Sequence, residues 1–130
     1  MKKTVMIVDD SATMRSLIVT YLTEIGDFEI LEAKSGFEAL KLLPTKGVDL
    51  ILTDINMPDI DGLELLNFVK SSPIYQHVPT IIITTERGEA DRQRGLALGA
   101  RAYIVKPFYL GELREAVAEV FPGEGASDEG

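Results

Sequence analysis

The segment Val48-Asp-Leu-Ile-Leu-Thr-Asp54-Ile-Asn-Met-Pro-Asp-Ile-Asp-Gly62 decides how the rest of the chain is interpreted. A short apolar run ends abruptly at Asp54, and Asn, Pro and Gly residues then break the chain. An apolar run bounded by turn signals is typical of a strand that is buried on both faces. An acid at its end would lie at the rim of a sheet, where open α/β folds bind their ligands. The segment therefore predicts that Asp54 is a chemically used carboxylate.

The composition indicates one globular domain. The chain has 130 residues, 45% of them hydrophobic, no cysteine and a net charge of −8. No apolar run approaches the roughly 18 residues that cross a bilayer, so we expect no membrane insertion. The lack of cysteine excludes disulfides and thiolate chemistry and fits a reducing cytoplasm. Because no Lys/Arg cluster offsets the acidic charge, nucleic acid is not an expected partner.

Strand-like and helix-like segments alternate along the chain. Apolar or β-branched runs predict strands over residues 4–8, 28–33, 50–53, 80–85 and 102–105. Apolar residues at helical spacing predict helices over residues 11–25, 36–43, 63–71, 89–98 and 110–120. The apolar face of the fourth helix is thin, and Gly95 weakens it. We expect a domain over residues 1–121 and a flexible acidic C-terminal tail over 122–130, with fraying from Phe121 onward.

Five strands that alternate with five helices predict an α/β fold, in which right-handed crossovers build a parallel sheet covered on both faces. Two strand orders fit this pattern, a flavodoxin-like 2-1-3-4-5 and a Rossmann half. The flavodoxin-like order is favoured for five short units, and it places a crevice between the first and third strands.

The carboxyl ends of the predicted strands carry the side chains with useful chemistry. In a parallel sheet these ends share one edge, which collects Asp9, Asp10, Asp54, Thr84, Thr85 and Lys106. Three carboxylates in one crevice repel one another, so at least one pKa should rise unless a cation arrives. Oxygen ligands with a few open positions suit Mg²⁺, which is usually shared with a phosphate.

These residues meet the requirements of an aspartyl-phosphate site. Mg²⁺ between Asp10 and Asp54 would neutralise the approach of a phosphoryl group to a carboxylate nucleophile. Lys106 would pair with one phosphoryl oxygen, and a threonine hydroxyl would bond another. Each residue alone has a simpler explanation, because acids often cap helices or occupy turns, and Thr84 and Lys106 suit strand ends. Their conjunction at successive strand ends favours the functional explanation.

Several short motifs occur in order from about Lys3 to Val120. They are Ile-Val-Asp9-Asp10-Ser, Asp54-Ile-Asn-Met-Pro58 with Asp61-Gly62, Thr84-Thr-Glu86, Gly99-Ala100 and Tyr103-Ile-Val-Lys106-Pro-Phe108. Together they resemble the receiver domain of two-component response regulators, and the stand-alone chemotaxis regulators of that family most of all. The last helix departs from the motor-binding members, which are richer in lysine near this helix, whereas Glu112, Glu115 and Glu119 dominate here.

The resemblance implies that Asp54 accepts a phosphoryl group from the phosphohistidine of a sensor histidine kinase. The implied Mg²⁺ ligands are Asp9 through water, Asp10, Asp54 and the backbone carbonyl of Asn56. Lys106 would pair with the phosphoryl group, and the Lys106–Pro107 peptide bond is expected to be cis. Such a protein catalyses only its own phosphorylation and dephosphorylation, so the resemblance does not imply a conventional enzyme.

The resemblance also implies a switch in a phosphorelay. Thr84 would swing towards the phosphoryl group while Tyr103 turns inward, which changes the surface of the fourth helix, fifth strand and fifth helix. Asn56 and Glu86 would flank the site, which implies a short-lived phosphoryl group and a response to a phosphatase. The other implied partner is a downstream target, such as a flagellar switch or another motility component.

We therefore predict a monomeric, cytoplasmic signalling protein that is switched by phosphorylation. Two other functions remain open. An aspartate-nucleophile phosphohydrolase usually needs a second acid two residues after the nucleophile, where Asn56 stands here. A receiver-like scaffold that binds partners without phosphorylation would not need the complete set of acids.

Overall fold

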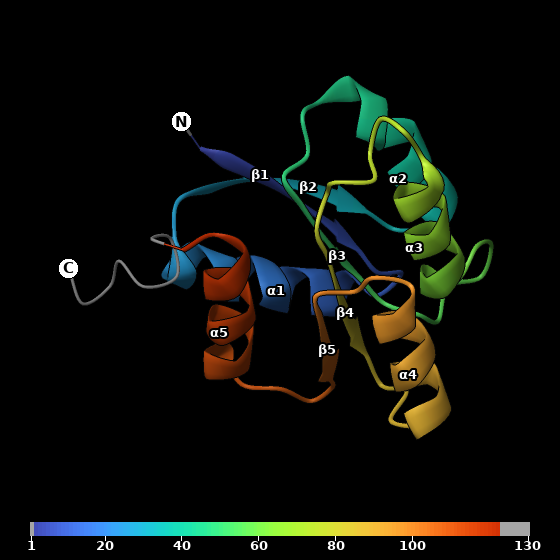
Figure 1. Ribbon diagram of the computed structural model, residues 1–130. Helices are drawn as coiled ribbons and strands as arrows, with labels where there is room; N and C mark the ends of the chain where they lie inside the picture. The colour runs from blue at the N-terminus through green and yellow to red at the C-terminus, as the bar shows by residue number, and fades with distance from the viewer. Residues whose placement is uncertain (1, 123–130) are drawn as a thin grey trace.

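The fold is a parallel sheet that lies between two layers of helices (Figure 1). A computed structural model describes residues 2–122 of the chain. The strands are β1 (Lys3–Val8), β2 (Phe28–Ala33), β3 (Leu50–Thr53), β4 (Thr80–Thr84) and β5 (Ala102–Val105). All neighbouring strands are parallel, and their order is β2-β1-β3-β4-β5. This order confirms the flavodoxin-like prediction over the Rossmann half.

The helices divide between the two faces of the sheet. They are α1 (Ala12–Ile25), α2 (Gly36–Leu42), α3 (Gly62–Ser71), α4 (Glu89–Ala97) and α5 (Leu110–Val120). Helices α1 and α5 cover one face, and α2, α3 and α4 cover the other (Figure 1). A short 3₁₀ turn, η1 (Leu43–Thr45), follows α2 and was not predicted. Pro44 lies in its first turn, where the missing N–H of proline is tolerated and a longer α-helix is interrupted.

The two faces of β1 show how the sequence builds both halves of the core. Val5 and Ile7 pack with the residues of α1 and α5, whereas Met6 and Val8 pack with those of α2 and α3. All four side chains are at most 1% exposed. Successive side chains of a strand point to opposite faces, so an uninterrupted apolar run is what a strand covered on both faces requires. Each such side chain contributes roughly 1.5–3 kcal/mol through burial.

Helix α4 is held to the sheet differently from the others. Gly95 is its one fully buried residue, as the thin apolar face predicted. A Cβ at this position would lie 2.7 Å from Cδ1 of Ile82 on β4. The glycine that weakens the helix therefore allows its backbone to approach the sheet closely.

The predicted fraying at Phe121 was wrong. Phe121 is 9% exposed, and its ring centroid lies 6.1 Å from that of Phe28. The ammonium group of Lys3 lies 5.6 Å from the Phe121 centroid, within reach of a cation–π contact. The burial of this large aromatic ring stabilises the end of the chain at Phe121. The acidic composition of the residues that follow did not reveal that burial. The predicted tail from residue 123 onward lies outside the described residues.

Within residues 2–122, none of the helices combines the length and hydropathy that a membrane span requires.

Candidate functional site

Asp54 lies directly after β3, at the carboxyl edge of the sheet, and is 7% exposed. Its Oδ1 accepts hydrogen bonds from the backbone N–H groups of Ile55 at 2.7 Å and Asn56 at 3.3 Å. Its Oδ2 pairs with Nζ of Lys106 at 3.2 Å. A role as a turn residue thus explains the bonds of Oδ1 only. Oδ2 is paired instead with Lys106, a charged side chain at the end of another strand.

The chain that follows Asp54 is fixed by close backbone packing. A Cβ at Gly62 would lie 2.0 Å from the backbone oxygen of Asp54, so no other residue fits at the start of α3. The N–H of Gly62 donates to the carbonyl of Ile55 at 2.9 Å. Asp61 and Glu64 form a capping box that begins α3 at this point. The pair Asp61-Gly62 in the sequence therefore reflects a close contact between the start of α3 and Asp54, the candidate phosphoacceptor.

Asp9 and Asp10 follow β1, the strand next to β3. The carboxylate of Asp9, only 2% exposed, accepts a hydrogen bond from the N–H of Ser11 at 2.9 Å and pairs with Nζ of Lys106 at 2.8 Å. The N-cap of α1 is Ser11, whose Oγ accepts from the N–H of Met14 at 3.1 Å. A capping role therefore does not explain the pair of acids.

The three acids meet as the strand order predicted. One carboxylate oxygen from each of Asp9, Asp10 and Asp54 lies within 4.8 Å of the other two. Carboxylate oxygens are the ligands that Mg²⁺ prefers, and Asp10 is exposed, which leaves room for bound water. The donor set thus fits a hard divalent cation.

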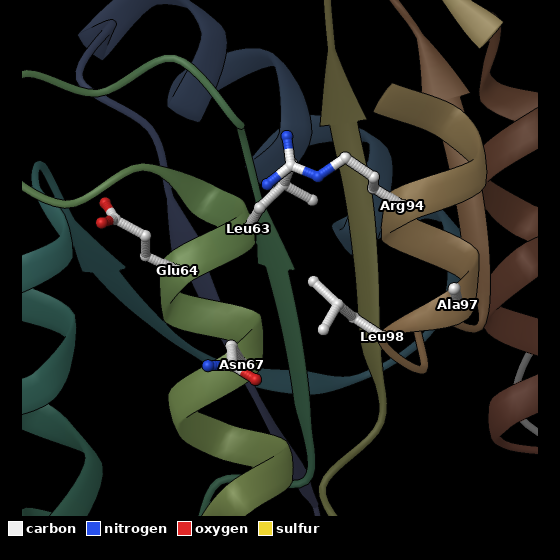
Figure 2. Close-up of a pocket in the computed structure, with 6 residues that line it drawn as sticks. All are labelled: Leu63, Glu64, Asn67, Arg94, Ala97 and Leu98. Carbon is white, nitrogen blue, oxygen red and sulfur yellow. The ribbon is translucent and has the colours of Figure 1, made fainter. Parts of the chain in front are cut away.

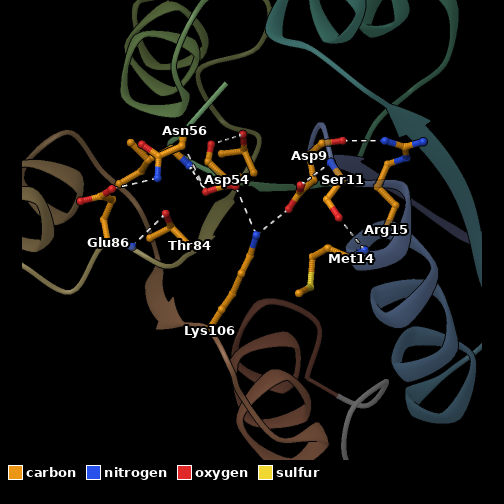
Figure 3. Close-up of polar contacts among 11 residues, drawn as sticks. Asp9, Ser11, Met14, Arg15, Asp54, Asn56, Thr84, Glu86 and Lys106 are labelled. Atoms are coloured by element: carbon orange, nitrogen blue, oxygen red, sulfur yellow. Dashed lines mark hydrogen bonds and ion pairs between the residues drawn. The ribbon is translucent and has the colours of Figure 1, made fainter. Parts of the chain in front are cut away.

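Lys106 already pairs with two of these acids, Asp9 and Asp54 (Figure 3). Its side chain is 9% exposed, its backbone N–H donates to the carbonyl of Thr84 at 2.8 Å, and the Lys106–Pro107 peptide bond is cis. Burial alone would lower the pKa of Lys106, but the bonds and charges of Asp9 and Asp54 outweigh it, so the pKa is raised. Sequence reasoning paired Lys106 with a phosphoryl group and did not foresee that it bridges two acids.

A chain of hydrogen bonds runs from the loop after Asp54 to Tyr103, and Figure 3 shows its first part, from Asn56 to Glu86. Nδ2 of Asn56 donates to Oε2 of Glu86 at 2.9 Å, and the hydroxyl of Tyr103 donates to the carbonyl of Glu86 at 2.8 Å. Thr84 is fully buried, and its Oγ1 accepts from the N–H of Glu86 at 3.3 Å. Glu86 therefore contacts three of the residues that the sequence singled out, whereas Thr85 is exposed.

Tyr103 is half-buried on β5. Its pKa is raised, first by burial and then by the nearby charges of Asp91 and Glu86. The hydroxyl therefore stays protonated, and remains a hydrogen-bond donor, to a higher pH than an ordinary tyrosine.

Sequence reasoning missed two residues that support the site. Nη1 of Arg15 donates to the carbonyl of Asp9 at 2.7 Å. The Asp59 carboxylate accepts from the N–H groups of Gly36 at 3.2 Å and Phe37 at 2.8 Å, and the bond from Phe37 is the main cause that lowers the pKa of Asp59. Both residues act through bonds to backbone groups, which motif spacing does not reveal. The first turn of α2, with its unpaired N–H groups, was the available signal for an acidic partner.

A groove of about 430 Å³ between α3 and α4 is separate from this site (Figure 2). It is lined by Leu63, Glu64, Asn67, Arg94, Ala97 and Leu98. The side chain of Leu98 points across the groove towards α3, and Arg94 extends along its upper end (Figure 2). None of the predicted site residues lines it.

Comparison with known proteins agrees with this geometry. The family model of the response regulator receiver domain matches residues 5–118. The chain therefore belongs to the response regulator receiver domain family.

Relatives of known name cover nearly the whole chain. It is 42% identical over 127 residues to a chemotaxis protein CheY homolog of Campylobacter jejuni, which covers 95% of this chain and 98% of the relative. It is 40% identical over 116 residues to the chemotaxis protein CheY1 of Helicobacter pylori, with coverage of 88% and 94%. The solved structure of the chemotaxis response regulator CheY4 of Vibrio cholerae is similar with a TM-score of 0.83 and 32% identity, over 93% of this chain and all of that one.

Proposed function

We propose that this protein is a CheY-type response regulator of a two-component system, which receives a phosphoryl group on Asp54 and acts in chemotaxis. The observation that carries the proposal is the meeting of the Asp9, Asp10 and Asp54 carboxylates at one edge of the sheet, where Lys106 pairs with Asp9 and Asp54. The similarity to chemotaxis proteins of two organisms supports the choice of pathway. The donor would be the phosphohistidine of a sensor histidine kinase, and the setting would be the cytoplasm.

The geometry around Asp54 suggests which oxygen reacts. Oδ1 is held by two backbone N–H bonds, whereas Oδ2 is paired only with the Lys106 side chain, which would move to a phosphoryl oxygen, so we assign Oδ2 as the attacking oxygen. Oδ2 would bond to phosphorus while the phosphorus–nitrogen bond of the donor breaks and its electron pair returns to the imidazole ring. Lys106 would then donate to a phosphoryl oxygen while it keeps its bond to Asp9.

Mg²⁺ would be held by Asp9 through water, by Asp10 and Asp54, and by the backbone carbonyl of Asn56. When bound, it would reduce the repulsion between the acids and the incoming phosphoryl group. The fit of the carboxylate oxygens to a hard cation supports this assignment.

The hydrogen bonds of Glu86 suggest how phosphorylation would reach the surface. Thr84 would turn its hydroxyl from the N–H of Glu86 to a phosphoryl oxygen, which would release one bond of the loop after β4. Tyr103 is bonded to the same residue, so its position would respond. The altered surface of α4, β5 and α5 would then bind a downstream target, such as a flagellar switch or another motility component, as a monomer.

Asn56 and Glu86 would control how long the phosphoryl group lasts. Their side chains are bonded to each other at the rim of the site, where an attacking water must pass. A phosphatase that displaces this pair would shorten the lifetime further.

Phosphorylation is tested with radiolabelled acetyl phosphate and Mg²⁺. Asp54→Asn should lose labelling completely, because an amide is a poor nucleophile for phosphorus. Asp27→Asn, which alters an exposed acid outside the site, should keep it and serves as the matched control. Full labelling of the Asp54→Asn protein would refute the assignment of the phosphoacceptor. Turnover of a small phosphate ester far beyond one phosphate per protein would favour a phosphohydrolase instead.

A further inference from the structure

Arg15 on α1 links three segments beside the acidic cluster. Its Nη1 donates to the backbone carbonyl of Asp9 at 2.7 Å, and its Nε donates to Oε1 of Glu32 on β2 at 2.9 Å (Figure 3 shows the bond to Asp9). The Arg15 side chain is 16% exposed and that of Glu32 is 46% exposed. Because the guanidinium group is planar and uses two of its N–H groups in different directions, both partners fix its orientation.

The carbonyl that Arg15 holds belongs to the peptide bond that leads into Asp10. The neighbouring acids are fixed by other means, since Asp9 is bonded to Ser11 and Lys106, and Asp54 to Ile55. The Asp10 side chain is exposed, and its carboxylate has no hydrogen bond among the residues that the structure describes. The orientation of its backbone is thus what sets the direction in which this side chain leaves the main chain.

Charge alone would give Arg15 the opposite effect. A guanidinium group next to a cation site repels the cation, and Glu32 only partly offsets that repulsion because the pair is accessible to solvent. If Arg15 acted as a charge, its removal would tighten the binding of Mg²⁺. If it acts by orientation, its removal would weaken binding, so the two explanations differ in sign.

We propose that Arg15, held in place by Glu32, is a positioning residue that aligns Asp10 for Mg²⁺. The inference rests on the proposed function, because it requires that the cluster binds Mg²⁺. Outer-shell partners of metal ligands typically contribute 10–100-fold to affinity. Arg15 holds a backbone group rather than the ligand atom, so we expect an effect of about tenfold, at the lower end of that range.

The experiment is a titration of the unphosphorylated full chain with Mg²⁺, followed by the amide NMR shifts of Asp10 and Asn56. Arg15→Met should raise the Kd about tenfold, and Arg15→Lys, which keeps the charge but not the planar fork, should give an intermediate value. Arg94→Met removes the same charge from an exposed pair within α4 and should leave the Kd unchanged.

The dispersion of the NMR spectrum shows whether each variant is folded, and Arg15→Lys gives the test if Arg15→Met is not. A Kd for either Arg15 variant that equals or falls below that of the wild type would overturn the proposal. If the wild-type protein itself shows no saturable Mg²⁺ shifts, the proposed function fails instead, so the two failures are distinguishable.

Discussion

Replacing Lys106 with methionine should destabilise the protein strongly in the absence of Mg²⁺. The side chains of Lys106, Asp9 and Asp54 are 9%, 2% and 8% exposed, so the ammonium group is shielded from water together with both of its partners. Methionine keeps most of the side-chain volume and removes the charge. Breaking a buried ion pair by removing one partner costs about 3–5 kcal/mol, because the remaining charges are left uncompensated.

Urea unfolding in the presence of a chelator measures this cost. With a slope of about 1–3 kcal/mol per molar urea, the transition midpoint should fall by roughly 2 M. Added Mg²⁺ should stabilise the variant more than the wild type, because it would bind three carboxylates with no competing ammonium group. Lys46→Met is the matched control. Lys46 pairs with Glu29 near the start of β2, away from the carboxyl edge of the sheet, and both side chains are more than two-fifths exposed. That substitution should cost less than about 1 kcal/mol.

The reasoning would be refuted if the two methionine variants unfolded at the same urea concentration. It would also fail if Mg²⁺ raised the midpoints of Lys106→Met and the wild type equally, because the ammonium group would then not compete for the acids.

Two further predictions concern Gly62 and Tyr103. Gly62→Ala should destabilise the fold by about 2–4 kcal/mol and slow phosphorylation, since its Cβ would fall 2.0 Å from the backbone oxygen of Asp54; a variant with wild-type urea midpoint and labelling rate would contradict the close packing. Tyr103 should be among the last tyrosines to ionise in an ultraviolet absorbance titration, because its pKa is raised above the ordinary value of 10.0. The Tyr103 hydroxyl thus contributes stability below pH 10.0 that is lost as the pH rises through the higher pKa of the folded state. The stability advantage of the wild type over Tyr103→Phe should therefore shrink in alkali, and an advantage that stays constant would contradict it.

Most of the fold could be predicted because the three central strands, β1, β3 and β4, bury both faces. The apolar run that ends at Asp54 is consistent with a strand covered on both faces, and so is the β-branched run of β4. The short turn at Pro44 and the burial of Phe121 were not predicted, because both depend on local packing rather than on periodicity. The boundaries of β4 and α4 differ from the prediction by one residue, as element ends usually do.

The composition of the acidic cluster could be predicted from strand ends alone, but its internal contacts could not. Parallel strands bring their carboxyl ends to one edge, which is enough to place Asp9, Asp10 and Asp54 together. The bridge formed by Lys106 and the bond from Arg15 to a backbone carbonyl depend on side-chain direction across three elements. Sequence spacing carries no information about that direction.

Helix α4 contacts the sheet through Gly95, so little free energy is needed to move this helix. Apolar burial contributes in proportion to area, and a helix whose one fully buried residue is Gly95 loses little of it when it shifts or frays. Helix α5, by contrast, buries Leu113 and Val117 and would lose several kcal/mol on leaving the sheet. The burial of the two helices that flank the same edge strand therefore differs, and a smaller change in free energy would displace α4 than α5.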